Sequence, residues 1–413
     1  MRNWHNTVKA AVLATVFPLC TAWAQQTSQQ LIEDLLSRVS AAEARIKDLE
    51  GKLEQRPQAS NETAAAAPAP LPMPAQLMPE SGGHDHGGGG LIASGLQMRG
   101  FGDIQYVAGD HAKRSTFVLG QFDLFMTSRL ADHWTFLAES VVQADPSNNS
   151  FGFEIERLQL NYARNEYLNV GFGRYHQSIG YYNTAYHHGT WFQTTTGRPY
   201  IFAFEDEGGI LPIHNVGVTV SGKLPSGKLD LQYAVEFGNG RTSRSQDTEF
   251  VQNVFDENNR KSVNIALSSR PQWFSGLQIG GSFLKDRLYP EGGPKLRQTI
   301  ASGYAVYHHD KVELLNEFIL MRNAAPGAVM NTPGFYTQIS RGWRALRPYI
   351  RYEYVNVNRR DPYFGDIGRR SGPLGGLRWD AGEFSAFKLE LGRLSRTGLP
   401  TTTTVAAQVA FAF

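Results

Sequence analysis

Residues 229–237 read Leu-Asp-Leu-Gln-Tyr-Ala-Val-Glu-Phe, and this stretch decides the fold class. Its odd-numbered positions are apolar or aromatic, whereas three of the four even-numbered positions between them are polar. Successive side chains of a strand point to opposite faces, so a period of two residues predicts a strand with one apolar and one polar face. The alternation recurs after Gly95, for example around Phe122, Leu124 and Met126.

Sixteen such segments can be counted in the remainder of the chain. They begin near residues 96, 116, 133, 154, 168, 216, 228, 261, 277, 297, 312, 333, 346, 369, 385 and 402. Dividing residues 96–413 among sixteen strands leaves about 20 residues for each strand and its connection, which suits membrane strands of about 10 residues. The sequence therefore predicts an all-β fold, a 16-stranded antiparallel transmembrane β-barrel, over residues 96–413.

The connections between these segments alternate in length. The short ones are 131–133, 165–167, 225–227, 309–311 and 381–384, and the long polar ones are 146–153, 178–214, 241–260, 286–296 and 358–368. Bacterial outer-membrane barrels have short periplasmic turns and long external loops, whereas a soluble sandwich has no reason to sort its loops in this way. An even strand number then places both ends of the barrel on the periplasmic side of a Gram-negative outer membrane, in contact with its lipid.

Composition excludes several other classes of protein. The chain has 413 residues, and 40 basic against 38 acidic side chains give a net charge of +2, which does not favour nucleic acid as a partner. The mean hydropathy of −0.35 argues against a bundle of transmembrane helices. The single cysteine, Cys20, excludes disulfide scaffolds and thiolate metal centres.

The sequence also gives no support for an enzyme. Residues 222–228 match the beginning of a phosphate-binding loop, but Leu229 replaces the required Ser or Thr and the motif spans a tight hairpin. No Gly-x-Ser-x-Gly elbow occurs, and strand parity offers no Ser/His/carboxylate set on one face. We therefore expect no catalytic residue, no cofactor and no assigned metal ligand.

The first 95 residues divide into three parts. Residues 1–24 have the pattern of a signal peptide, with Arg2 and Lys9 before an apolar run that is half the length a membrane anchor needs. Residues 25–56 predict an α-helical coiled-coil stalk in the periplasm. Its seam is Ile32, Leu35, Val39, Ala42, Ile46, Leu49 and Leu53. Residues 57–95 have the Ala/Pro/Gly composition of a linker, in which His84 and His86 could catch a metal ion.

Two stretches resemble known outer-membrane proteins. Residues 171–182, Gly-Phe-Gly-Arg-Tyr-His-Gln-Ser-Ile-Gly-Tyr-Tyr, resemble the strand-then-loop segment of the phosphate-selective porin O and P family. The final alternating strand, which ends in Phe413, resembles the signal that the barrel-assembly machinery reads. The resemblance implies a homotrimeric porin for small hydrophilic solutes, with a third external loop folded inwards and a preference for anions such as phosphate. The coiled coil resembles the stalks of certain sugar porins.

Strand parity selects the charged residues that would line such a channel, since a charge on the lipid face would cost about 2–4 kcal/mol near the middle of the membrane. The pore-lining candidates are Arg99, Arg129, Arg157, Arg351 and Arg378. In the long connection 178–214, the triplet Glu205, Asp206 and Glu207 would face them across a constriction and set a transverse field. Acidic residues on the same faces leave a second possibility, structural ion pairing. These acids are Asp103, Asp123, Glu139, Glu236, Glu353, Asp380 and Glu390.

Two questions stay open at this point. His187 and His188, with His176 and His214 in the same region, could bind a metal at the pore mouth, but no carboxylate spacing supports a defined site. The alternative to a passive porin is a structural outer-membrane barrel that is tethered or assembled through its periplasmic coiled coil.

Overall fold

The computed structural model describes Lys47 and residues 95–110, 115–145, 149–186, 189–205, 207–241, 255–256, 258–289 and 294–413. The chain divides into two units, residues 1–72 and 73–413, and all of the described residues except Lys47 belong to the second unit. The predicted signal peptide, coiled coil and linker lie outside the described residues, apart from Lys47 and Gly95. In the described part of the chain, no helix is both long and apolar enough to cross a bilayer.

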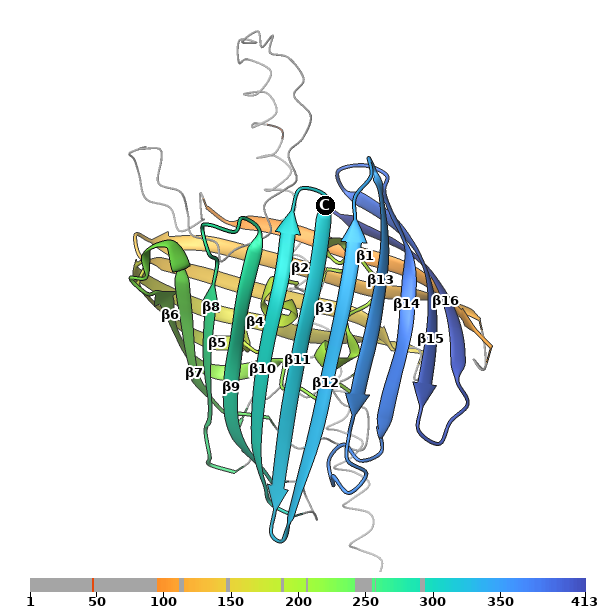
Figure 1. The fold of residues 1–413 in the computed structure, drawn as a ribbon. Coiled ribbons are helices and arrows are strands. Elements are labelled where there is room, and N and C mark those ends of the chain that lie inside the picture. Colours follow the sequence, from red (N-terminus) through yellow and green to blue (C-terminus); the bar gives the residue numbers. More distant parts are fainter. Residues whose placement is uncertain are drawn as a thin grey trace, which may run out of the picture. The chain divides into compact units, whose positions relative to one another are not determined.

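The second unit is a closed antiparallel barrel of sixteen strands, which confirms the predicted fold (Figure 1). Each strand pairs with its neighbours in sequence, and β1 pairs with β16 to close the barrel. The strands are β1 Gln97–Gly109, β2 Thr116–Ala131, β3 Trp134–Asp145, β4 Ser150–Asn165, β5 Leu168–His176, β6 His214–Lys223, β7 Leu231–Gly238, β8 Ser262–Ser269, β9 Leu277–Leu288, β10 Leu296–His309, β11 Val312–Ala325, β12 Ala328–Arg341, β13 Leu346–Asn356, β14 Arg369–Asp380, β15 Ser385–Arg396 and β16 Thr402–Ala412.

Most strands begin close to the predicted position, and the three exceptions have local causes. β4 begins at Ser150 rather than near residue 154, because its pairing with β3 extends to Asp145 opposite Ser150. β12 begins at Ala328 rather than near residue 333, because only Pro326 and Gly327 separate it from β11. Both hairpins are therefore longer than the alternation alone predicts.

The third exception is β7, which begins at Leu231 rather than near residue 228. Gly227–Leu229 forms a 3-10 turn, and Asp230 follows in the left-handed region at φ 44°. Gly227 itself has a φ of 54°, a region that glycine enters without steric cost. The turn thus takes up the residues that the alternating pattern assigns to the beginning of the strand.

The outer surface of the barrel is apolar. Along β15, Phe387, Leu389 and Leu391 are exposed, whereas Ala386 and Lys388 between them are buried. The final strand shows the same division, since Val405 and Phe413 are exposed and Ala406, Gln408 and Ala410 are buried. A continuous exposed apolar surface of this extent is typical of a barrel that faces lipid.

The inner surface differs from the simple prediction of a polar lumen. β9 to β12 carry apolar side chains on both faces, and the inward ones include Leu284, Ile300, Leu315 and Ile319, all of which are almost completely buried. Their burial has a direct cause, because the long connection between β5 and β6 packs on this side of the interior.

Candidate channel and its inserted loop

Residues 177–213, here called the inserted loop, connect β5 to β6 and fold into the barrel. The loop contains the short helices α2 Tyr182–Ala185, η1 Thr190–Phe192 and η2 Tyr200–Phe202. Figure 1 shows these helices between the near and far walls. Tyr182, Ile201 and Phe202 form a buried apolar cluster with the inward side chains of β9 to β12. Apolar packing therefore fills one side of the lumen.

Carboxylates of this same wall accept hydrogen bonds from the loop. Glu317 on β11 accepts bonds from the backbone N–H groups of Tyr181 at 2.5 Å and Tyr182 at 2.9 Å. Glu313 on the same strand accepts bonds from the hydroxyls of Tyr186 at 3.1 Å and Thr194 at 3.0 Å. An intramolecular hydrogen bond contributes about 0.5–1.5 kcal/mol, so these four contacts together attach the loop to β11.

The carboxylates of two further strands continue this attachment. Glu353 on β13 accepts a bond from the backbone N–H of Tyr200 at 3.2 Å. Glu390 on β15 accepts bonds from the Thr196 hydroxyl at 2.8 Å and the Thr196 backbone N–H at 3.3 Å. The loop is thus attached along β11, β13 and β15.

Cationic side chains of the wall bond to the loop's carbonyl groups. Arg351 on β13 donates to the Thr195 hydroxyl at 2.9 Å and to the carbonyl oxygens of Gly197 at 3.0 Å and Arg198 at 3.3 Å. Arg378 on β14 donates to the carbonyls of Trp191 at 2.7 Å and Gln193 at 2.9 Å. Lys388 on β15 donates to Thr190 and Thr195. The prediction from parity includes Arg351 and Arg378 but not Lys388.

Within the loop, Arg198 organises its neighbours. Its guanidinium lies 4.2 Å from the centre of the Phe204 ring and 5.3 Å from that of Tyr182, at distances that permit cation–π attraction. It also donates to the carbonyl oxygens of Phe202 at 2.7 Å and Tyr186 at 3.2 Å. One side chain thereby links η2 to α2.

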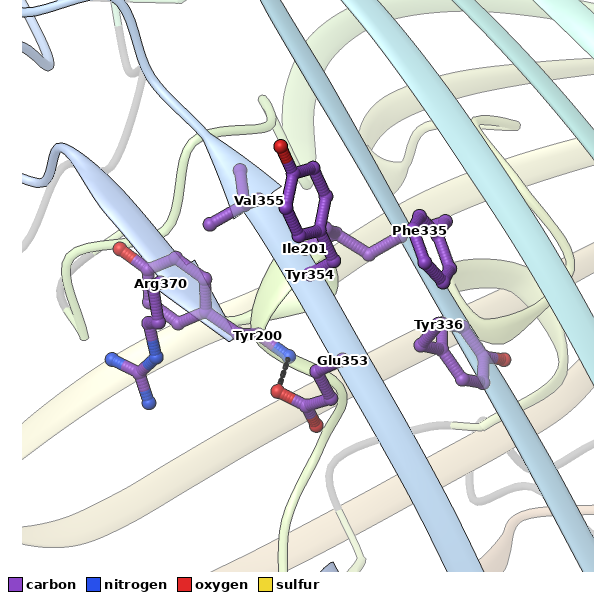
Figure 2. A pocket seen from close by; sticks show the side chains of 8 residues that line it. All are labelled: Tyr200, Ile201, Phe335, Tyr336, Glu353, Tyr354, Val355 and Arg370. Atoms are coloured by element: carbon purple, nitrogen blue, oxygen red, sulfur yellow. Dashed lines mark hydrogen bonds between the residues drawn. The ribbon is translucent and has the colours of Figure 1, made fainter. Parts of the chain in front are cut away.

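Beside the loop, a cavity of about 590 Å³ remains between the loop and the wall formed by β1 to β3 and β13 to β16. Its polar lining includes Arg198, Glu207, Arg351, Glu353, Arg370, Glu390 and Arg396. Arg370 on β14 and Arg396 on β15 are directly paired in the register. The Arg370 guanidinium lies 3.9 Å from the centre of the Tyr200 ring, and Figure 2 shows Tyr200 between Arg370 and Glu353.

The five arginines predicted from parity fall into two groups. Arg157, Arg351 and Arg378 lie inside the barrel, and each has a carboxylate partner: Glu139 at 2.5 Å, Glu353 at 2.7 Å and Asp380 at 2.7 Å. Arg99 and Arg129 are exposed near the end with the short turns, where Arg129 lies 3.4 Å from Asp132. Arg157, Arg351 and Arg378 thus form the structural ion pairs that the sequence left as a second possibility.

The three predicted constriction residues do not act as one group. Glu205 is buried at the base of the loop and accepts bonds from the backbone N–H groups of Ile213 at 2.7 Å and His214 at 3.1 Å. Burial alone would raise the pKa of Glu205, but His214 and Arg241 lower it to about 2. Asp206 lies outside the described residues, and Glu207 is exposed and lines the cavity.

Two of the histidines considered as metal ligands lie side by side in the structure. His176 and His214 pair in the register of β5 and β6, with ring centres 4.8 Å apart. Glu156 on β4 lies beside them, so the structure supplies the carboxylate that sequence spacing did not indicate. His84, His86, His187 and His188 lie outside the described residues.

No family model and no curated protein sequence matches the chain. Solved structures do match, each over 77% of this chain. OmpF of Salmonella typhi in complex with daunomycin has a TM-score of 0.55 at 13% identity over 97% of its own length. The anion-selective porin of Comamonas acidovorans gives 0.54 at 12% identity over 99%. The outer-membrane channel DcaP of Acinetobacter baumannii gives 0.52 at 10% identity over 97%. At these identities the chain shares the barrel fold of outer-membrane porins.

Proposed function

We propose that this chain is an outer-membrane porin that lets small hydrophilic solutes diffuse passively and favours anions. The observation that carries the proposal is the polar cavity beside the inserted loop, inside a closed barrel with an apolar exterior. A barrel of about sixteen strands is wide enough for an aqueous channel. The inserted loop narrows this channel while leaving one side lined by charged groups.

The preference for anions rests on which charges of the cavity already have partners. Glu353 pairs with Arg351, and Glu390 accepts bonds from Thr196 and from the Tyr349 hydroxyl at 2.9 Å. Arg370 and Arg396 form no ion pair with any described residue. Two guanidinium groups in register can therefore attract an anion, and phosphate suits them because guanidinium binds its oxygens bidentately.

Planar-bilayer recordings with the purified protein test this function. We expect ohmic conductance and, under a salt gradient, a reversal potential of the sign that anion preference produces. Added phosphate should reduce chloride current if it binds beside Arg370 and Arg396. A complete lack of conductance would exclude a porin, and a cation-selective reversal potential would exclude the preference for anions.

Placement in a membrane predicts the effect of a charge on the outer surface. Leu389, 58% exposed on β15, should face lipid, so Leu389→Arg should cost about 2–4 kcal/mol. Leu399→Arg is the matched control. Leu399 is 59% exposed but lies in the connection beyond β15, so a charge there should cost only about 0–1 kcal/mol. Urea titration of the refolded barrels in lipid vesicles measures both. Equal losses would show that Leu389 does not contact lipid.

We propose further that the porin is a homotrimer with its stalk in the periplasm, inserted by the barrel-assembly machinery through the strand ending at Phe413. The heptad seam of residues 25–56 supports self-association. Deleting residues 28–56 should weaken trimers on native gels while conductance per barrel persists. Two results together would favour the tethering role instead: the intact protein conducts no current, and deletion of the stalk changes the phenotype of the cell.

A further inference from the structure

Three potential metal ligands meet at the neck of the inserted loop. His176 is the last residue of β5 and His214 is the first residue of β6, so they stand at the two ends of the loop. Glu156 comes from β4, where the pairing with β3 shifts by one residue. One ligand atom from each of the three lies within 4.8 Å of the others, and Nε2 of His214 is 2.7 Å from a carboxylate oxygen of Glu156.

The hydrogen bonds of the two imidazoles orient them towards a common point. Nδ1 of His176 lies 3.3 Å from the carbonyl oxygen of Asn183, which can only accept a hydrogen bond. Nδ1 of His214 lies 3.2 Å from the carboxylate of Glu205. Nδ1 of His176 therefore carries a proton, and in the neutral ring its Nε2 is the atom with a lone pair. His214 has a carboxylate beside each nitrogen, so its Nε2 binds a metal once the proton on that nitrogen has been released, with Nδ1–H still donating to Glu205.

This pattern is the one that metal-binding histidines show. A histidine that binds a metal usually donates its other N–H to a carboxylate or a backbone carbonyl, which fixes the ring and raises its basicity. Glu205 and Asn183 supply these two kinds of acceptor, and both belong to the inserted loop. The outer contacts of the site are thus made by the segment that fills the lumen.

We propose that Glu156, His176 and His214 bind a divalent transition metal ion of the zinc class at the neck of the inserted loop. Two imidazoles and one carboxylate are a known zinc donor set that leaves a fourth position for water. Ligand atoms about 2.1 Å from zinc lie about 3.4 Å apart at a tetrahedral angle. The opening of the His214–Glu156 contact and a small rotation of His176 would produce this spacing.

The ion would join β4, through Glu156, to the two ends of the inserted loop, through His176 and His214. Asn183 and Glu205 would link the two histidines to residues within the loop. Glu156 and His214 are almost completely buried, and Nε2 of His176 is buried as well, so the ion would be enclosed by the protein. The three ligands are not among the residues that line the cavity. Metal binding therefore adds a structural attachment for the loop and does not depend on which solutes pass.

A metal-free alternative uses the same residues. A doubly protonated His214 could bridge Glu156 and Glu205 as a salt-bridged triad, since its two nitrogens lie 2.7 and 3.2 Å from those carboxylates. The triad consists of Glu156, His214 and Glu205, so it does not include His176. Variants of His176 therefore separate the two descriptions.

The test measures zinc on the full-length refolded protein after treatment with a chelator. Because His84, His86, His187 and His188 could also bind zinc, the parent and all variants carry glutamine at these four positions. Zinc alone is added, unbound metal is removed by gel filtration, and bound zinc is measured by mass spectrometry. We expect one zinc per chain, a higher melting temperature, and visible absorption of low-coordinate Co²⁺ when cobalt replaces zinc.

His176→Gln and Glu156→Gln should abolish stoichiometric binding and the rise in melting temperature. Glu205→Gln leaves all three ligands and should weaken zinc affinity about 10–100-fold. His309→Gln, at the end with the short turns and 44% exposed, should bind as the parent does. Zinc retention by the parent no greater than that of His176→Gln would overturn the proposal, as would an equal loss in His309→Gln. Because zinc retention is measured without conductance, a negative result leaves the porin proposal untouched.

Discussion

Replacing Arg351 by alanine is expected to loosen the inserted loop and destabilise the barrel by about 3–5 kcal/mol, the cost of breaking a buried ion pair. Arg351 bonds to Thr195, Gly197 and Arg198 in the loop while it pairs with Glu353. Its removal deprives three oxygen atoms of the loop of their donor and leaves the Glu353 carboxylate without its cation. The loop should then move into and out of the cavity.

Single-channel recording and urea unfolding measure this effect. The Arg351→Ala channel should show a larger mean conductance with frequent transitions between levels, and its unfolding midpoint should fall. Arg347→Ala is the matched control, because Arg347 lies on the same strand and donates to Ser340 at 3.2 Å rather than to the loop. Arg351→Ala recordings as quiet as those of Arg347→Ala would contradict the attachment.

The double variant Arg370→Glu, Arg396→Glu should reverse the ion preference of the channel. A unit charge about 8 Å from a permeating ion is worth about 2 kcal/mol at an effective dielectric constant of about 20. Inverting two such charges should change the ratio of anion to cation permeability at least about tenfold after salt screening. The reversal potential under a salt gradient should therefore change sign.

Arg129→Glu provides the comparison for this second result. Its side chain is 56% exposed beside Asp132 at the end with the short turns, away from the cavity lining. The same inversion of charge should therefore shift the reversal potential much less. A larger shift from Arg129→Glu than from the double variant would show that ion selectivity is set near Arg129 and not at the cavity.

The strands could be predicted because alternation is a local property of the sequence. The period of two predicts all sixteen strands, and connection lengths predict their arrangement. It fails locally at β11, where Leu314 and Leu315 or Phe318 and Ile319 follow each other and both faces are apolar. Polar and apolar side chains alternate along a strand when its inner face meets water. On β11 the inner face packs against the inserted loop, so apolar side chains occur there as well.

The site could be predicted only in part for a related reason. Strand parity places Arg351, Arg370, Arg378 and Lys388 on the inner face. Arg370 and Lys388 could therefore have been predicted as inward residues in the same way as Arg351 and Arg378. Parity cannot say which inward cation meets water and which bonds to the inserted loop, because that depends on contacts between residues more than 150 positions apart, such as Arg351 with Thr195 and Gly197. Glu156 meets His176 and His214 over shorter separations of 20 and 58 positions, but their meeting also depends on which strands pair and on the one-residue shift in the pairing of β3 with β4.

The attachment of the inserted loop at both sides of the barrel also has a mechanical consequence. A thin-walled ring under lateral pressure flattens into an ellipse unless a cross-member joins its opposite sides. The loop is covalently continuous with β5 and β6 and is bonded to β11, β13 and β15. Shortening it to widen the passage would therefore also soften the barrel against compression by the bilayer, so pore width and rigidity cannot be changed independently.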